Sequence, residues 1–264
     1  MAPRPGPEDE AAARDGSAAC PTPPAGWLGE ERVSVVIPAL NEAENLHCVL
    51  PRIPPWVHEV VLVDDHCTDD TVEVARRLLP SITVVANRGR RGKGAALRRG
   101  YEAATGSIIV QIDADGSEAP EEIPAFVGAL LAGADYAKGT RFVPGGGTSD
   151  MTSLRQWGNR AFVWLVWALF GTRFTDLCYG YNAFWARILP DLALDADGFE
   201  IEAMLNIRVL KQGLRIREVP SFEAERVNGS GRLSTFPDGW RVLSTILAER
   251  GSVRPPGRKG VPWT

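Results

Sequence analysis

Two aspartates, Asp113 and Asp115, lie one residue apart in the stretch VQIDADGSEAP, residues 110 to 120. They follow directly after the apolar run with which this stretch begins. Carboxylates this close repel each other and resist burial unless positive charge lies between them. Hard divalent cations bind carboxylate oxygens, so the pair predicts a divalent-cation site. A helix cap with a turn is the alternative, although a single aspartate would suffice for a cap.

Polar residues also follow three other apolar runs in the first half of the chain. Asn41 and Glu42 follow the first run, and Asp65 follows the second. Asn87 follows the third and precedes a glycine- and arginine-rich segment, residues 88–94. In a mostly parallel sheet these strand ends meet at one edge, where ligands bind. The sequence therefore predicts one site built from four strand ends.

Short β-branched runs alternate with helical patterns, which predicts an α/β fold with a mostly parallel central sheet flanked by helices. Asn41 with Glu44 resembles a capping box for the first helix, and Asp69 or Asp70 is expected to cap the second. The expected strands cover residues 33–37, 59–63, 82–86, 107–112 and 134–138. The expected helices cover residues 45–50, 71–79, 93–104, 120–131, 161–170, 198–213 and 234–249.

The composition fits one large α/β domain and gives no indication of a nucleic-acid-binding protein or a disulfide scaffold. The 264 residues carry a formal net charge of −4, and the acidic excess lies within residues 1–31. A neutral domain gives no reason to expect a nucleic-acid partner. The four cysteines form no C-x-x-C pair, which favours a reducing compartment over a disulfide scaffold.

We expect three segments along the chain. Residues 1–31 are rich in Ala, Pro, Gly and acid, lack a signal-peptide core, and are expected to be disordered. Residues 32–250 are expected to form the single domain, and residues 251–264 a basic, flexible tail. The longest apolar run, residues 161–170, is too short to cross a bilayer. It predicts a buried helix, and its tryptophans leave contact with a lipid surface as the alternative.

Several phosphate- and metal-binding signatures are absent from the sequence. Residues 89–94 lack the spacing and the Ser/Thr of a P-loop, and no G-x-G-x-x-G follows the first strand. The run that begins at Asp113 has its glycine at the fourth position and a proline at the twelfth, unlike a calcium loop. These absences exclude the common nucleotide-binding loops and an EF-hand.

Four strings, VSVVIPALNEAENL, VVLVDDHCTDDT, RGKGAALRRGYEAATG and VQIDADGS, occur in this order at domain-scale spacing. Together they resemble glycosyltransferase family 2, whose members have the GT-A fold. Within that family the resemblance is closest to the polyprenyl- and dolichyl-phosphate sugar synthases, and it covers roughly residues 33–245.

The resemblance implies roles for the residues that match the family's motifs. Asp65 corresponds to the carboxylate that binds the base and the ribose. Asp113 and Asp115 correspond to the D-x-D pair that holds the metal and the donor diphosphate. Lys93, at a helix opening, and Arg141 are expected to place positive charge near the phosphates, with a solvated basic turn as the alternative for Lys93. The implied nucleotide-sugar-binding residues are Pro38, Asn41, Glu42, Asp65, Lys93, Asp113, Ala114 and Asp115.

Asp176 joins Arg141 and Lys93 in the implied catalytic set. In family members that glycosylate hydroxyls, an acid in this region acts as the general base. A phosphate acceptor needs no base because it is largely dianionic at neutral pH, so Asp176 would then orient Arg141 or the acceptor. A helix cap is the structural alternative. Glu200 and Glu202 stand two apart on an expected helix, so only one of them can line a cleft.

Residues 226–233, RVNGSGRL, resemble the family's loop ahead of the last helix, which closes over the metal and donor. Arg226, Ser230 and Arg232 are expected to meet the acceptor phosphate and the leaving diphosphate, with glycines that allow movement. A plain surface loop is the alternative. One position departs from the pattern, because Ser117 stands where the polyprenyl-phosphate synthases often carry a metal-binding glutamine.

The resemblance implies an enzyme that transfers a hexose, with inversion and with a divalent cation, from GDP-mannose or a UDP-hexose. The expected acceptor is a polyprenyl phosphate, and the expected location is cytoplasmic with peripheral contact at the membrane face. Transfer to a soluble hydroxyl with Asp176 as base is the alternative. A non-catalytic sugar-nucleotide binder is a further one, against which the intact D-x-D pair argues.

Overall fold

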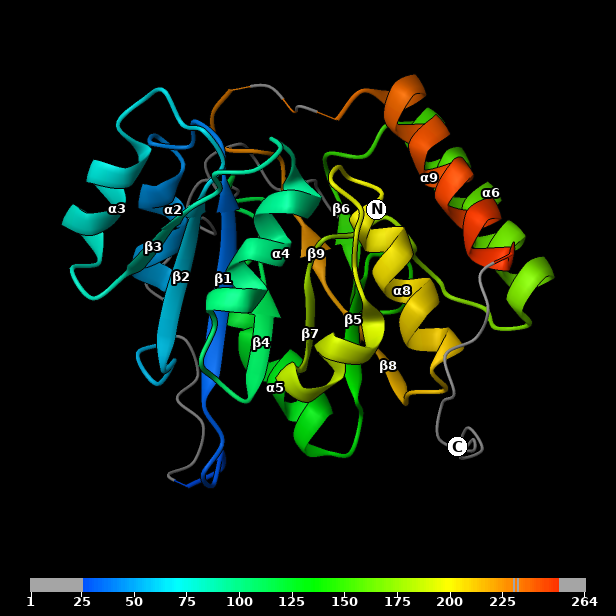
Figure 1. The fold of residues 1–264 in the computed structure, drawn as a ribbon, viewed down its shortest axis with the longest axis horizontal. Coiled ribbons are helices and arrows are strands. Elements are labelled where there is room, and N and C mark those ends of the chain that lie inside the picture. Colours follow the sequence, from blue (N-terminus) through cyan, green and yellow to red (C-terminus); the bar gives the residue numbers. More distant parts are fainter. Residues whose placement is uncertain (1–25, 230, 232, 252–264) are drawn as a thin grey trace, which may run out of the picture.

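The computed structural model describes residues 26–229, 231 and 233–251, and a seven-stranded sheet forms its centre (Figure 1). Neighbouring strands are parallel except at β7, which runs antiparallel to both β4 and β5. In sheet order the strands are β3 (Thr83–Ala86), β2 (Glu59–Asp64), β1 (Val33–Ala39), β4 (Ile108–Gln111), β7 (Asn182–Trp185), β5 (Tyr136–Thr140) and β8 (Ile216–Pro220).

Helices cover both faces of the sheet, as the apolar strands require. On one face lie α2 (Leu46–Val49), α3 (Thr71–Leu78) and α5 (Ile123–Leu131). On the other lie α4 (Lys93–Ala103) and α8 (Ile201–Lys211). Each face has its own apolar cluster, because successive residues of a strand point to opposite faces. The expected α/β layers are confirmed.

Two long helices, α6 (Ser153–Phe170) and α9 (Thr235–Gly251), lie side by side at the β8 end of the sheet (Figure 1). With α8 they enclose a third apolar cluster. None of the helices within the described residues is long and apolar enough to cross a membrane. The remaining elements are α7 (Leu189–Leu192), three 3₁₀ turns (Leu50–Arg52, Pro120–Glu122 and Ala186–Ile188) and a two-stranded parallel sheet of β6 (Gly147–Thr148) and β9 (Phe222–Glu223).

One glycine sets the distance between α4 and the sheet. A Cβ at Gly100 would lie 2.4 Å from Val36 Cγ1 and 2.8 Å from Val63 Cγ2. Only a residue without a side chain lets the helix approach this closely. The close approach fixes the position of Lys93, which begins the same helix and belongs to the site described below.

All five predicted strands are present, with ends that differ by up to two residues. The strands β7 and β8 were not predicted. The first is only four residues long, and the second carries charged residues, Arg217 and Glu218, in its middle. Neither therefore shows the apolar run that marks a buried strand.

The first predicted helix cap is wrong, whereas the second is confirmed in position. The first helix begins at Leu46 rather than Asn45, and no side chain caps it. Asn41, the expected cap, instead has a positive φ of 52°. Asp70 occupies the N-cap position of α3 without a side-chain bond, whereas the Asp69 carboxylate accepts a hydrogen bond from the Thr71 N–H at 3.1 Å. At Asn41, side-chain bonds to Thr68 in the neighbouring loop take precedence over a helix cap.

The predicted segment boundaries differ from the structure at one end. Residues 26–30 form turns, and the Trp27 ring packs edge-on against Trp56 at 5.3 Å between centroids, so the ordered domain begins before residue 32. Residues 1–25, predicted to be disordered, and residues 252–264 of the tail predicted for residues 251–264 fall outside the described residues.

Candidate active site

The carboxyl ends of β1, β2, β3 and β4 meet at one edge of the sheet, as predicted. The register pairs Ala39 at the end of β1 with Asp64 at the end of β2, and Asp64 with Ala86 of β3. The loops that leave these strands are bonded to one another, which turns four separate strand ends into one continuous rim.

Asp65 is a buried carboxylate, 3% exposed, held by two donors. The Asn87 side-chain amide donates to Oδ1 at 2.7 Å, and the Gly92 backbone N–H donates to Oδ2 at 2.9 Å. These bonds join the end of β2 to the loop that opens α4. Each carboxylate oxygen retains a further acceptor position, so a ribose hydroxyl or a base N–H can still bond there.

The loop after β1 is hydrogen-bonded to the loop after β2. The Asn41 side chain accepts from the Thr68 N–H at 2.7 Å and donates to the Thr68 hydroxyl at 3.1 Å. The Glu42 N–H donates to the Thr71 hydroxyl at 2.8 Å. Pro38 lies within β1 and is half-buried. These contacts hold the residues predicted to lie against a nucleoside beside Asp65.

Lys93 lies between two carboxylates. Its Nζ is 2.7 Å from Asp113 Oδ2 and 2.7 Å from Glu202 Oε1. Burial opposes its charge, but Asp113 and Glu202 outweigh burial and raise the pKa of Lys93 well above its usual range. Burial raises the pKa of Asp113 to about 6, with Lys93 opposing the rise and Asp115 adding to it. Of the two glutamates predicted to diverge, Glu202 lines the site, whereas Glu200 Oε1 accepts from the Gly198 N–H at 3.0 Å.

Glu118 is a site residue that the sequence analysis missed. It is buried, and its Oε2 accepts the Asp113 N–H at 2.8 Å. Burial raises its pKa well above the usual range, and Asp113 adds to the rise. Gly180 closes over the same group: a Cβ there would lie 2.9 Å from Lys93 Nζ, 3.0 Å from Glu202 Oε1 and 3.2 Å from Glu118 Oε1. Glu118 lies in the same stretch as the D-x-D pair, but nothing in its sequence position predicts that it is buried.

Arg226 bridges Asp115 and Glu42. Its Nη1 is 3.2 Å from Asp115 Oδ2, and its Nη2 forms an ion pair with Glu42 Oε2. Glu42 also accepts from the Asn45 side-chain amide at 2.7 Å, and Asn45 Oδ1 accepts from the Asn228 N–H at 2.9 Å. The loop after β9 is thereby tied to the loop after β1, directly over the second aspartate of the pair. The predicted residues Ser230 and Arg232 lie outside the described residues.

Ser117, the residue that departs from the family pattern, supports Asp115. Its hydroxyl donates to Asp115 Oδ1 at 2.7 Å, and its backbone N–H donates to the same oxygen at 3.0 Å. Ala114, between the two aspartates, is buried in the core, so its side chain faces away from any ligand.

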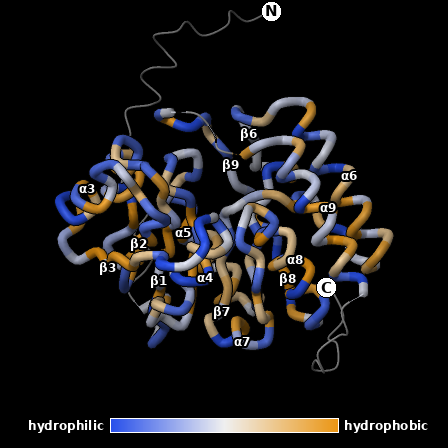
Figure 2. Tube along the Cα trace, turned by 45° about the horizontal axis from the view of Figure 1, so that its top comes forward, coloured by the Kyte–Doolittle hydropathy of each residue, from blue (hydrophilic) through white to orange (hydrophobic). Residues whose placement is uncertain are grey.

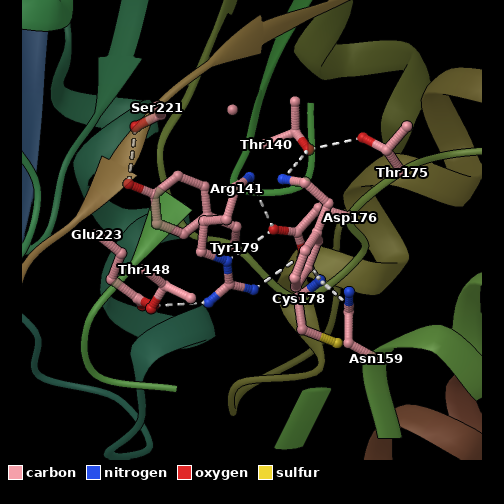
Figure 3. Close-up of polar contacts among 12 residues, drawn as sticks. Thr140, Arg141, Thr148, Asn159, Thr175, Asp176, Cys178, Tyr179, Ser221 and Glu223 are labelled. Carbon is pink, nitrogen blue, oxygen red and sulfur yellow. Dashed lines mark hydrogen bonds and ion pairs between the residues drawn. The ribbon is translucent and has the colours of Figure 1, made fainter. Parts of the chain in front are cut away.

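Arg141 and Asp176 form a buried pair on the other side of the site (Figure 3). Arg141 Nε donates to Asp176 Oδ2 at 2.7 Å, and Nη2 donates to Oδ1 at 2.9 Å. The Asp176 side chain is fully buried. Burial alone would raise its pKa, but Arg141 outweighs burial and lowers the pKa below the usual range. The structure therefore pairs two of the three predicted catalytic residues and leaves the carboxylate ionised.

Neighbouring side chains hold this pair rigid. Arg141 Nη1 donates to Glu223 Oε2 at 2.9 Å, and the Arg141 guanidinium lies 4.7 Å from the centre of the Tyr179 ring (Figure 3). Asn159 Oδ1, from α6, accepts the Cys178 N–H at 3.2 Å and fixes the turn that follows Asp176. Sequence reasoning missed these supports because they come from elements far apart in the chain.

The antiparallel strand β7 explains why residues 176–181 reach the site. Because β7 runs against its neighbours, its first residue, Asn182, lies at the edge where β4 ends, opposite Gln111. The segment that enters β7 therefore lies beside the D-x-D pair. The Tyr179 ring lies against Arg141, and a Cβ on the adjacent Gly180 would lie 2.9 Å from Lys93 Nζ, so two consecutive residues approach the two carboxylate groups.

The residues present fit a divalent cation shared with a diphosphate. The described residues contain no group of three or more His, Cys, Asp or Glu side chains placed to hold a metal ion. Mg²⁺ is commonly bound by one or two carboxylates together with substrate phosphates and waters rather than by an all-protein cage. Asp113 and Asp115 supply two such carboxylates, and Lys93 and Arg226 supply the positive charge that now balances them.

Comparison with known proteins identifies the family. The glycosyl transferase family 2 model matches residues 34–189. The chain is also 33% identical over 254 residues to the polyprenol monophosphomannose synthase of Mycolicibacterium smegmatis, covering 87% of this chain and 88% of that one. The chain belongs to glycosyltransferase family 2. It is a glycosyltransferase, as predicted.

Two further similarities bear on the family 2 assignment. The undecaprenyl-phosphate mannosyltransferase of Micrococcus luteus is 33% identical over 219 residues, covering 77% of this chain and 88% of that protein. A crystal structure of glucosyl-3-phosphoglycerate synthase from Mycobacterium tuberculosis, in complex with Mn²⁺, uridine diphosphate and glucosyl-3-phosphoglycerate, superposes with a TM-score of 0.71. That pair is 27% identical over 86% of this chain and 82% of the other. The expected GT-A fold is thereby confirmed.

Proposed function

We propose that this family 2 enzyme transfers a sugar, with inversion, from a nucleotide-diphosphate sugar to the phosphate of a polyprenyl phosphate. A phosphate oxygen of the acceptor attacks the anomeric carbon, the bond from that carbon to the donor diphosphate breaks, and the nucleoside diphosphate leaves. Mannose is the proposed sugar because two similar relatives are named for mannose transfer.

The state of Asp176 is the observation that carries the choice of acceptor. A hydroxyl acceptor needs a base to take its proton as the new bond forms. Asp176, which would be the base for a hydroxyl acceptor, has both oxygens occupied by Arg141 and a pKa lowered below its usual range. A carboxylate in that state is a weak proton acceptor, whereas a phosphate dianion needs none. Asp176 is better suited to hold Arg141 where an anionic acceptor would meet it.

The donor-side residues have complementary proposed roles. Asp65, with Pro38, Asn41 and Glu42 beside it, holds the nucleoside. A divalent cation held by Asp113 and Asp115 would neutralise charge on the departing diphosphate. Lys93 keeps its proton between Asp113 and Glu202, and provides fixed positive charge at the opening of α4.

Arg226 has a separate proposed role as a counterion that exchanges partners. It now balances Asp115 and Glu42, and it lies on the loop that precedes α9. When a donor brings its own cation, the guanidinium becomes free to meet phosphate oxygens, for which its fork of donors is suited. Ser230 and Arg232 are proposed to act from the same loop.

A soluble acceptor is the second candidate. The specific observation in its favour is the structural likeness to glucosyl-3-phosphoglycerate synthase. A phosphorylated small molecule would also meet Arg141, so this candidate shares the anion-binding side of the site and differs in the atom that attacks.

Nucleotide release from a panel of GDP- and UDP-sugars tests the proposal. Each donor is supplied with Mg²⁺ or Mn²⁺, with and without a short-chain polyprenyl phosphate or 3-phosphoglycerate, and product linkage is read by mass spectrometry. We expect release from a mannose donor that requires the lipid phosphate and the cation. Release that depends on 3-phosphoglycerate alone would support the soluble acceptor, and donor binding without any turnover would contradict both.

A further inference from the structure

The outer surfaces of α6 and α9 expose large apolar side chains. We define the α6–α9 face by six of them: Trp157, Trp164 and Trp167 of α6, and Phe236, Trp240 and Leu247 of α9. Four of these side chains are more than 60% exposed, with Phe236 at 79%. Apolar stretches run along both helices (Figure 2). Clustered exposed aromatic residues mark an interaction surface rather than ordinary surface composition.

The exposed apolar side chains do not result from poor packing of these helices, because the opposite sides of both helices are well packed. Val163 and Val166 of α6, and Val242 and Ile246 of α9, are buried in the cluster shared with α8. Each helix therefore has one face that is buried against the domain, and a second apolar face that has no partner among the described residues. Such a helix is typical of one that lies on a membrane interface.

The charge of the α6–α9 face has one sign. The exposed charged residues of the two helices are arginines: Arg160, Arg241 and Arg250. α6 contains no acid, and both acids of α9, Asp238 and Glu249, are buried. The sequence from residue 252 to residue 264 adds three more basic residues and no acid. The face is thus complementary to a surface that carries negative charge.

We propose that the α6–α9 face docks on a lipid bilayer surface with anionic headgroups. Tryptophan is the side chain that favours the headgroup level of a bilayer, and nearby arginines add attraction to anionic lipids. A second copy of the chain fits less well. A symmetric interface would bring the same arginine-bearing surfaces together, with no exposed acid on either helix to pair with them. The inference rests on the proposed function, because a polyprenyl phosphate resides in a bilayer.

The α6–α9 face is connected to the acceptor side of the site. Trp157 lies two residues from Asn159, the residue that holds the turn after Asp176. Arg155 Nη2, in the first turn of α6, donates to the Leu233 carbonyl at 3.1 Å, at the end of the loop that carries Arg226. A bilayer against this face would therefore present an acceptor phosphate beside Arg141 rather than at the nucleoside end.

Vesicle co-sedimentation tests the docking. The full chain is mixed with vesicles of phosphatidylcholine alone, or with added phosphatidylglycerol. We expect binding to the anionic vesicles and about tenfold weaker binding of the Trp157→Ser/Trp164→Ser/Trp240→Ser variant. The Arg160→Gln/Arg250→Gln variant should lose about fivefold per arginine on anionic vesicles only. The matched control is Arg76→Gln/Arg77→Gln, which removes the same charge from α3 at the far end of the molecule and should bind normally (Figure 1).

Three outcomes would overturn the docking: no binding of the wild-type chain to anionic vesicles, equal binding of the tryptophan variant, or a wild-type dimer that this variant makes monomeric. Thermal unfolding checks that each variant folds, and the arginine variant keeps the test valid if the tryptophan variant does not. Transfer to a short, water-soluble polyprenyl phosphate separates the two proposals. Soluble transfer without vesicle binding overturns the docking alone, whereas vesicle binding without any transfer overturns the proposed function alone.

Discussion

The site contains two groups of acidic residues whose pKa values are shifted in opposite directions. In the first, Asp113 and Asp115 lie among further carboxylates and are balanced by Lys93 and Arg226, which come from separate elements. In the second, one guanidinium is bound by both oxygens of Asp176. The pKa of Asp113 is raised, whereas that of Asp176 is lowered. A carboxylate whose counterions can be exchanged suits ligand binding, and one with a fixed counterion suits positioning.

The largest expected effect is on transfer by the first group. Asp115→Asn should lower the rate of nucleotide release about 10³-fold, because one of the two carboxylates proposed to hold the cation is lost. The midpoint of thermal unfolding should change little, since the substitution also removes repulsion between the aspartates. Ser117→Ala is the control: it removes one hydrogen bond to Asp115 and should retain most activity. Full activity of Asp115→Asn would exclude the D-x-D pair from the metal site.

Asp176→Asn should lower stability more than Asp115→Asn does, and should lower activity less. Breaking a buried ion pair from one side costs about 3 kcal/mol of unfolding free energy, measured by denaturant titration. Transfer to the lipid phosphate should fall about 10²-fold through misplacement of Arg141 but remain detectable. Asp135→Asn is the matched control, because its partner Arg215 is 55% exposed and such pairs contribute less than about 1 kcal/mol. A folded Asp176→Asn protein with no residual transfer would identify Asp176 as a base.

Gly180→Ala tests whether the two groups are coupled. Its Cβ would meet Lys93 Nζ at 2.9 Å and force the ammonium away from its carboxylates. We expect roughly tenfold weaker donor binding, measured by calorimetry in the presence of the cation. Gly128→Ala is the control, because its Cβ would have no neighbour within 4 Å and alanine favours the helix. Equal donor binding by both variants would show that the groups act independently.

The smallest expected effect is the response of the second group to pH. The pKa of Asp176 is lowered in the folded protein, so its stabilisation is complete above the unfolded pKa of about 4 and is lost only as pH falls towards the folded value. The stability difference between wild type and Asp176→Asn should therefore be constant from about pH 8 to pH 5. A difference that declines within that range would mean that Asp176 titrates like the raised acids of the first group.

Much of the architecture could be predicted because it depends on local patterns. The apolar runs of β1 to β5, the helix that begins at Lys93 and the meeting of four strand ends all follow from periodicity and parallel topology. The partners within the site could not be predicted in the same way. Arg226 bonds to Glu42 across 184 positions of sequence, and no local pattern specifies such a contact. Glu118 was missed because a buried acid is rare unless neighbouring groups hold it.

The antiparallel direction of β7 affects how the acceptor preference of such an enzyme can evolve. The residues that we propose to hold the donor follow the ends of the parallel strands, whose register is set within the sheet. Part of the proposed acceptor side, including Asp176, lies on the connection from α6 into β7, which enters from the opposite direction. Insertions or deletions in residues 171–181 would leave the register of β1 to β4 intact. Acceptor preference can thus diverge by changes of length in one connection while the donor half is inherited unaltered.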